Sequence, residues 1–159
     1  TQNRNSIQLF VILNCRMTLR EKVLFICTGN ACRSQIAHGL LNDLASANFE
    51  VFSAGSHPSK VHPISIAVME EIGIDISKHT SDHIDDYMNK DIDIVITVCD
   101  NANNVCPLFP ENTKCIHWSI DDPFTNWNFD IDQLRTFRET REEIKSKVLK
   151  FIKAYKIGK

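Results

Sequence analysis

A cluster of cysteine, arginine and small residues near the first third of the chain could carry out chemistry on an oxyanion. The segment 27–34 reads Cys-Thr-Gly-Asn-Ala-Cys-Arg-Ser, between a short apolar run and an amphipathic stretch. A loop from strand to helix converges its backbone N–H groups on one point, where the helix N-terminus adds positive potential. Arg33 can hold two oxygens of one anion with its planar guanidinium. We therefore expect an oxyanion site formed by Thr28, Gly29, Asn30, Ala31, Cys32 and Arg33.

Cys27 is the candidate nucleophile of this loop. The positive potential that holds an anion also favours the thiolate form of a thiol at the first loop position. Such a thiolate would touch the anion that it attacks. We expect Ser34 to hydrogen-bond the thiolate, Asn30 to hold the shape of the loop, and Cys32 to pack beneath it. The alternative interpretation is a tight turn with two incidental cysteines.

A second pair of cysteines, Cys99 and Cys106, follows another predicted strand. The residues between them, Asp-Asn-Ala-Asn-Asn-Val, are polar and favour turns. A redox pair is the interpretation that we prefer; two unrelated core cysteines and a metal site are the alternatives. A disulfide needs Cα atoms about 4.4–6.8 Å apart. A redox role therefore requires a flexible loop.

An acidic pair, Asp121 and Asp122, follows the last predicted strand. Asp122 precedes Pro123, and the proline restricts it to extended backbone and stiffens the loop. Asp121 does not adjoin the proline and is the less favoured acidic group. A solvated acidic turn is the structural alternative.

The predicted elements place these residues at one edge of a sheet. Strands are expected at 23–26, 51–52, 93–98 and 114–118, and helices at 34–47, 63–72 and 131–155. This alternation predicts a single α/β domain with a four-stranded, mainly parallel sheet flanked by helices. Ligands bind such sheets beyond the carboxyl ends of the strands. Cys27, Cys99 and Asp122 follow three of these ends, while Cys115 and Ile131 are expected in the core.

Composition restricts the class of protein. The chain has 159 residues, of which 43% are hydrophobic and 24% charged, with a formal net charge of −2. These values fit one ordinary globular domain and give no general attraction to nucleic acids or membranes. Six cysteines in a chain of this length favour reactive thiols in the reducing cytoplasm over a disulfide framework.

The first residues are expected to be an extension. The apolar run at 7–13 is not followed by the small-residue cleavage site that a secretory signal needs. We expect Met17 to be the natural start, residues 1–16 to lie outside the fold, and residues 17–159 to form the domain. Cys15 is given no functional role.

The Cys-x5-Arg-Ser pattern resembles the low-molecular-weight tyrosine phosphatase superfamily and implies its flavodoxin-like topology. Within that superfamily, the amino-acid sequence of residues 27–37 resembles the thioredoxin-coupled arsenate reductases more closely than the phosphatases. The similarity runs from about Val23 to Tyr155. It includes the segments 53–55, 73–77 and 80–82, the pattern Cys99…Cys106-Pro107, and His117-Trp118…Asp122-Pro123.

This resemblance implies reduction of arsenate to arsenite, and hence arsenic detoxification. Cys27 would attack arsenate held by the loop and Arg33, while Asp122 protonates the departing oxygen. Cys99 would then attack Cys27, and Cys106 would attack Cys99, leaving a disulfide for thioredoxin to reduce. It further implies no tightly bound cofactor, phosphate or sulfate as mimics of arsenate, and a monomer without nucleic-acid or membrane partners.

Two other functions remain open at this point. A phosphomonoester hydrolase of the tyrosine phosphatase type would use Cys27, Arg33 and Asp122, but phosphatases of this fold are not expected to have the Cys99/Cys106 pair. A module that senses oxyanions or redox state would bind an oxyanion, or form a disulfide, without catalytic turnover.

Some relatives bind a potassium ion beside the anion loop. The matching positions Asn30, Ser53, Thr80 and Asp82 fit oxygen ligation. His38 stands where the family has a glutamate, and imidazole offers no oxygen to a hard cation. We therefore predict no firm metal site, with His38 on a solvated helix face. Structural roles are expected for the remaining candidate histidines, His62, His79 and His117.

Overall fold

A four-stranded parallel sheet forms the centre of the protein. The computed structural model describes residues 19–158, apart from the side chains of residues 103, 106, 107 and 157; the extension expected at 1–16, with Cys15, lies outside this range. The strands are β1 (Glu21–Cys27), β2 (Phe49–Gly55), β3 (Ile94–Thr97) and β4 (Lys114–His117), in the spatial order β2-β1-β3-β4. All three strand pairs are parallel. The predicted α/β class with a four-stranded parallel sheet is confirmed.

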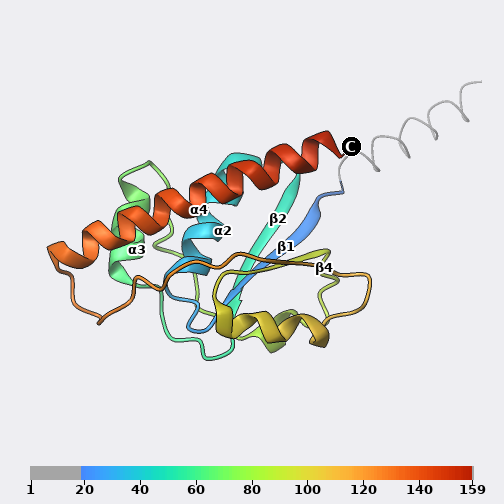
Figure 1. Ribbon diagram of the computed structural model, residues 1–159, viewed down its shortest axis with the longest axis horizontal. Coiled ribbons are helices and arrows are strands. Elements are labelled where there is room, and N and C mark those ends of the chain that lie inside the picture. The colour runs from blue at the N-terminus through green and yellow to red at the C-terminus, as the bar shows by residue number, and fades with distance from the viewer. Residues whose placement is uncertain (1–18, 159) are drawn as a thin grey trace, which may run out of the picture.

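Within residues 19–158, three α-helices and two 3₁₀ helices flank the sheet or connect its strands. The α-helices are α2 (Arg33–Ala45), α3 (Pro63–Glu70) and α4 (Ile131–Ile157), and the 3₁₀ helices are η1 (Ile84–Tyr87) and η2 (Asp100–Leu108). Figure 1 shows α4 lying along the length of the molecule beside α2 and α3, with which it packs. Among the described residues, none of the helices has the length and hydropathy required to cross a bilayer.

Alternation along the strands assigns the helices to the two faces of the sheet. Phe25 of β1 contacts Trp118, which in turn contacts Phe151 of α4. Phe52 of β2 points the opposite way and contacts Tyr87 of η1. The sheet is therefore covered by α-helices on one face and by a 3₁₀ turn on the other. Val23 to Ile26 of the central β1 are fully buried between them.

Two residues expected in the core lie at the surface instead. Ile131 is 84% exposed because it begins α4, directly after the N-cap Asp130, on the solvent side of that helix. Cys115 is exposed because β4 is an edge strand of the sheet. The strand itself was predicted correctly, but apolar patterning does not encode its place at the edge.

The carboxyl end of β2 supports the loop after β1. A Cβ atom on Gly55 would lie 2.4 Å from the Thr28 carbonyl oxygen, so only glycine permits this approach. The same carbonyl accepts a hydrogen bond from the His57 amide at 2.9 Å, and the Gly29 carbonyl accepts one from the Ser59 amide at 3.1 Å. The segment that follows β2 thus braces the loop 28–32.

Candidate active site

The Cys27 thiol lies at the carboxyl end of β1 and is only 3% exposed. Its Sγ is 2.9 Å from Ser34 Oγ and accepts a hydrogen bond from the Asn30 amide at 3.2 Å. These two contacts fix the position of the Cys27 sulfur at the start of the anion loop.

Asn30 organises the loop around Cys27. Its backbone has a φ of 45°, in the left-handed region that asparagine tolerates better than most residues. Its side-chain Nδ2 donates to Ser34 Oγ at 2.8 Å, and its Oδ1 accepts from the Asp82 amide at 2.9 Å. Because Ser34 Oγ accepts from Asn30, its own hydrogen is left to point at Cys27.

Arg33 begins α2 and reaches across to the loop after β4. Its guanidinium donates to the Ile120 carbonyl at 2.9 Å and pairs with Asp122 Oδ2 at 3.2 Å. The residue is only 8% exposed, and its Nε has no hydrogen-bond partner among the described residues. Buried donors in proteins are nearly always satisfied, so this N–H is suited to a bound oxyanion.

Asp122 lines the same pocket as Cys27. Its Oδ1 accepts from the Phe124 amide at 3.1 Å, while its side chain is 53% exposed. Asp122 lines the pocket and Asp121 does not. The placement favours Asp122 over its neighbour as the acidic group of the site.

The pocket above the loop has a volume of about 240 Å³. It is lined by Cys27, Thr28, Gly29, Ala31, Cys32, Arg33, Ser59, Asp122, Phe124 and Trp127. Sequence reasoning did not find Ser59, Phe124 or Trp127. The available signal in the sequence was the presence of two large aromatic residues shortly after Asp122-Pro123, in a segment otherwise rich in polar residues.

Cys32 is buried, at 5% exposure, but it lines the pocket instead of packing below the loop as we expected. Burial raises the pKa of its thiol to about 12, and the nearby charges of Asp122 and Cys27 act in the same direction. Cys32 therefore remains a neutral thiol at physiological pH. This difference leaves Cys27 as the thiol of the loop suited to nucleophilic attack.

Cys99 follows β3 and borders the anion loop. It is buried, and its Sγ lies 3.5 Å from Thr28 Oγ1. Cys106 belongs to η2, but the position of its side chain lies outside the described residues. The segment between the two cysteines lies in the 3₁₀ helix η2. The mobility that a redox role requires of this segment stays a prediction. Short i→i+3 turns suit its run of aspartate and asparagine.

The residues that match the potassium ligands are held by the protein's own hydrogen bonds. Ser53 Oγ pairs with His38 Nδ1 at 3.0 Å, and Asp82 Oδ2 accepts from Tyr87 at 2.7 Å. The Thr80 carbonyl accepts from Gln35 at 2.9 Å. Among the described residues, no group of three or more His, Cys, Asp or Glu side chains could hold a metal ion. The His38 imidazole thus contacts the Ser53 hydroxyl, and it offers no oxygen to a hard cation.

His38 is mostly buried, contrary to the solvated helix face that we expected. Its ring stacks on that of His79, with centroids 4.2 Å apart. Burial lowers the pKa of His38 to about 3, and His79 acts in the same direction. A neutral imidazole pair therefore occupies this place. The neighbour that covers His38 is distant in sequence, which helix periodicity could not reveal.

The other three histidines considered from the sequence, His62, His79 and His117, have hydrogen-bond partners. His79 Nδ1 lies 3.0 Å from Gln35 Oε1. His117 bridges Thr97 Oγ1 at 2.7 Å and Asp100 Oδ1 at 3.0 Å. His62 is fully buried between the anion loop and the loop that carries Asp122.

A central strand of the parallel sheet ends at a buried cysteine in an anion loop. An arginine and an aspartate line the same pocket. This arrangement defines a cysteine-dependent enzyme of the phosphatase class. Comparison with known proteins agrees with this assignment. Residues 22–158 match the family described as low molecular weight phosphotyrosine protein phosphatase. The chain belongs to that family.

Within the family, the chain is similar to arsenate reductases. It is 42% identical over 133 residues to an arsenate reductase of Staphylococcus aureus, covering 83% of this chain and 96% of that protein. A solved arsenate reductase in its phosphate-binding state superposes with a TM-score of 0.72 at 38% identity, covering 84% of this chain and 98% of that one. The thioredoxin-dependent arsenate reductase of Corynebacterium glutamicum gives a TM-score of 0.72 at 27% identity, covering 98% of this chain and 72% of that one.

Proposed function

We propose that this protein reduces arsenate to arsenite through Cys27, Cys99 and Cys106, with thioredoxin as the reductant. The similarity to arsenate reductases supports the reaction. The observation that carries the proposal is the buried Cys99 Sγ, 3.5 Å from Thr28 Oγ1 of the anion loop. A phosphatase reaction has no use for a second thiol there, whereas a reductase needs one to displace arsenic from the first.

The first step joins sulfur to arsenic. Arsenate binds to the loop amides and to the unpaired Nε of Arg33. The Cys27 thiolate forms a sulfur–arsenic bond while one arsenic–oxygen bond breaks. Asp122, which lines the same pocket, gives its proton to the departing hydroxyl, which leaves as water.

The second step transfers two electrons to arsenic. The Cys99 thiolate attacks the sulfur of Cys27, and the sulfur–arsenic bond breaks with its electron pair on arsenic. As(V) thereby becomes As(III), which leaves as arsenite, and two thiols become the Cys27–Cys99 disulfide. Cys106 then attacks Cys99 and releases the Cys27 thiolate. Thioredoxin reduces the remaining Cys99–Cys106 disulfide by thiol–disulfide exchange.

A phosphomonoester hydrolase is the second candidate function. Phosphate and arsenate are both tetrahedral oxyanions, so the loop, Arg33 and Asp122 would serve either one. Phe124 and Trp127 add aromatic walls that the ring of an aryl phosphoester could contact. In this reaction water hydrolyses the Cys27 phospho-adduct, and neither Cys99 nor Cys106 takes part.

The two functions are separated by a coupled assay with thioredoxin, thioredoxin reductase and NADPH. A reductase oxidises NADPH at a rate that rises with arsenate and vanishes without thioredoxin. Hydrolysis of p-nitrophenyl phosphate by the same preparation measures the phosphatase activity. Fast hydrolysis without any arsenate-dependent NADPH oxidation would contradict the proposed reductase.

Replacing Arg33 by lysine is expected to lower kcat/KM for arsenate by about 10²–10³-fold, although the charge is kept. Lysine cannot reproduce a planar grip on two oxygens, and it lacks the Nε–H that is unpaired here. Steady-state kinetics of Arg33→Lys check this, with the exposed Arg135→Lys on α4 as the matched control. Near-normal kcat/KM would show that Arg33 has only a structural role.

Replacing Asp122 by asparagine is expected to slow formation of the Cys27 adduct by about 10²–10⁴-fold, because an amide cannot deliver the proton. Inhibition by phosphate should change little, since asparagine can still accept from the Phe124 amide. Rapid-quench measurement of the adduct step checks this. Asp121→Asn serves as the control; if it were the slower variant, the assignment of the acid would be wrong.

A further inference from the structure

His62 connects the anion loop to helix α3. The residue is 0% exposed, and its backbone N–H donates to the Ala31 carbonyl of the anion loop at 3.0 Å. Ser65 Oγ, in the first turn of α3, donates to the same carbonyl at 3.1 Å. The start of α3 is thus bonded to the loop that holds the anion.

The imidazole of His62 makes two further hydrogen bonds. Its Nδ1 accepts from the Ile64 amide at 3.1 Å, which caps the N-terminus of α3. Its Nε2 lies 2.8 Å from the Asn126 carbonyl oxygen, which can only accept. The ring must therefore be neutral with its hydrogen on Nε2. One nitrogen serves the helix and the other serves the loop that carries Asp122.

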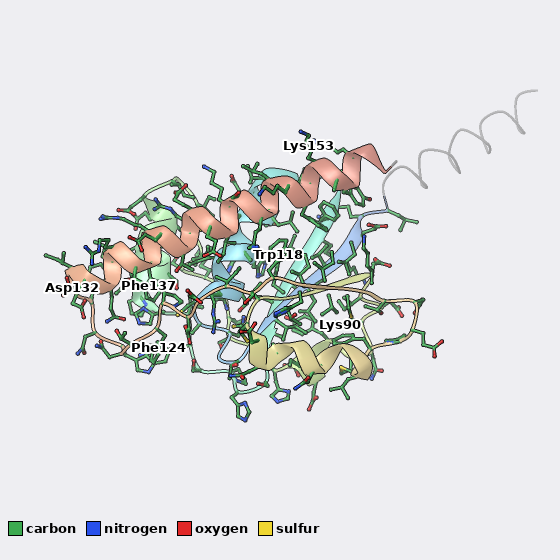
Figure 2. The ribbon with its side chains drawn as sticks, in the orientation of Figure 1. Lys90, Trp118, Phe124, Asp132, Phe137 and Lys153 are labelled. Atoms are coloured by element: carbon green, nitrogen blue, oxygen red, sulfur yellow. The ribbon has the colours of Figure 1, made fainter. Side chains whose placement is uncertain are left out.

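The same ring packs against the aromatic walls of the pocket. It stacks on Trp127, with centroids 5.2 Å apart and planes at 16°, and meets the Phe124 ring edge-on at 5.8 Å. Phe137 of α4 contacts it at 4.9 Å. Figure 2 shows Phe124 in the loop beneath the N-terminal half of α4 and Phe137 on that helix. His62 is therefore enclosed by the groups that shape the pocket.

These contacts lead to Asp122 by a short route. The backbone amide of Phe124 donates to Asp122 Oδ1, so the position of Phe124 fixes the carboxylate. Arg33 holds the beginning of this loop at the Ile120 carbonyl, and His62 holds its far side at Asn126. The loop that carries the carboxylate is thus hydrogen-bonded at both ends. Arg33 belongs to the anion loop, and His62 is hydrogen-bonded to it through the Ala31 carbonyl.

We propose that His62 is the positioning residue that aligns the Asp122 carboxyl with the anion site, through the Asn126 carbonyl and the stacked rings of Phe124 and Trp127. This inference rests on the proposed function only in taking Asp122 as the general acid. The His62 side chain does not itself line the pocket, so its effect would be on the rate of proton delivery and not on anion binding.

Two substitutions separate its two hydrogen bonds. In His62→Gln the amide nitrogen can take the place of Nε2 and still donate to Asn126. In His62→Asn the amide oxygen can take the place of Nδ1 and still cap α3, since asparagine is a favoured N-cap residue. A role in positioning predicts that glutamine preserves the rate and asparagine does not, whatever the order of their melting temperatures.

The experiment measures the burst of p-nitrophenolate from p-nitrophenyl phosphate and the arsenite formed in a single turnover without thioredoxin. His62→Asn should slow both by about 10–100-fold, with phosphate inhibition little changed, because small misplacements of a catalytic group have effects of this size. His62→Gln should recover most of the rate. His83→Asn is the matched control, because His83 Nδ1 caps η1 in the same way outside the pocket.

A double-mutant cycle with Asp122→Asn gives the decisive comparison. If His62 acts through Asp122, His62→Asn should cost little further rate once the carboxyl is gone. The inference would be overturned if the rate loss of the double variant equalled the product of the two single losses. A wild-type rate in His62→Asn would overturn it as well. A normal burst without arsenite would overturn the proposed reductase but leave the His62 result intact. A wild-type protein that shows neither reaction would overturn both.

Discussion

Replacing Cys27 by serine is expected to abolish both arsenate reduction and phosphoester hydrolysis, with losses of about 10⁴-fold or more. Both reactions begin with attack by this sulfur. A serine hydroxyl is a much weaker nucleophile than a cysteine sulfur. The Asn30 amide and Ser34 Oγ, which contact Cys27 Sγ, therefore cannot create a comparable nucleophile from it. Steady-state assays with arsenate and with p-nitrophenyl phosphate measure the two losses.

Cys115→Ser is the matched control for this substitution. Cys115 is an exposed thiol on the edge strand β4, outside the pocket, and its removal should leave both activities unchanged. Binding of phosphate to Cys27→Ser, followed by calorimetry, shows whether the anion loop is intact. Turnover of either substrate by this variant would mean that another group is the nucleophile.

Replacing Cys99 by serine is expected to stop the reaction before arsenite is released, while phosphoester hydrolysis stays close to the wild-type rate. The Cys27–arsenic adduct then has no internal thiol to displace it, whereas water can still hydrolyse a Cys27 phospho-adduct. The comparison separates the two functions within one protein. Single-turnover arsenite assays and p-nitrophenolate release provide the two measurements.

Phosphoester hydrolysis also controls for folding, since Cys99 is buried near Thr28 and serine adds a polar group there. Equal losses of both activities would point to a damaged anion loop, and Cys99→Ala then removes the thiol without adding a hydroxyl. Arsenite release at the wild-type rate from both variants would exclude Cys99 from the reaction.

Local sequence was sufficient to predict the sheet and the anion loop. The apolar run of β1 is buried on both faces, and the cysteine that follows it must lie at the carboxyl end of a central strand. The segment 27–34 then leads directly into α2, so that Cys27, Asn30 and Ser34 come together within a few residues of chain. Short-range geometry of this kind is readable from residue types and spacing.

Features that depend on distant neighbours were not predictable in the same way. The exposure of Cys115 follows from the strand order, and the burial of His38 follows from its stacking on His79. The aromatic walls Phe124 and Trp127 pack against His62, more than sixty residues earlier in the chain. Periodicity identifies which face of an element is apolar, but it does not identify what will cover it.

The most direct test of the three-cysteine relay is a single turnover of Cys106→Ser with excess arsenate and without thioredoxin. The relay predicts one arsenite per enzyme molecule, followed by a complete stop with a Cys27–Cys99 disulfide that mass spectrometry of the non-reduced peptides identifies. Continued turnover with thioredoxin at the wild-type rate, or arsenite release without that disulfide, would contradict the relay.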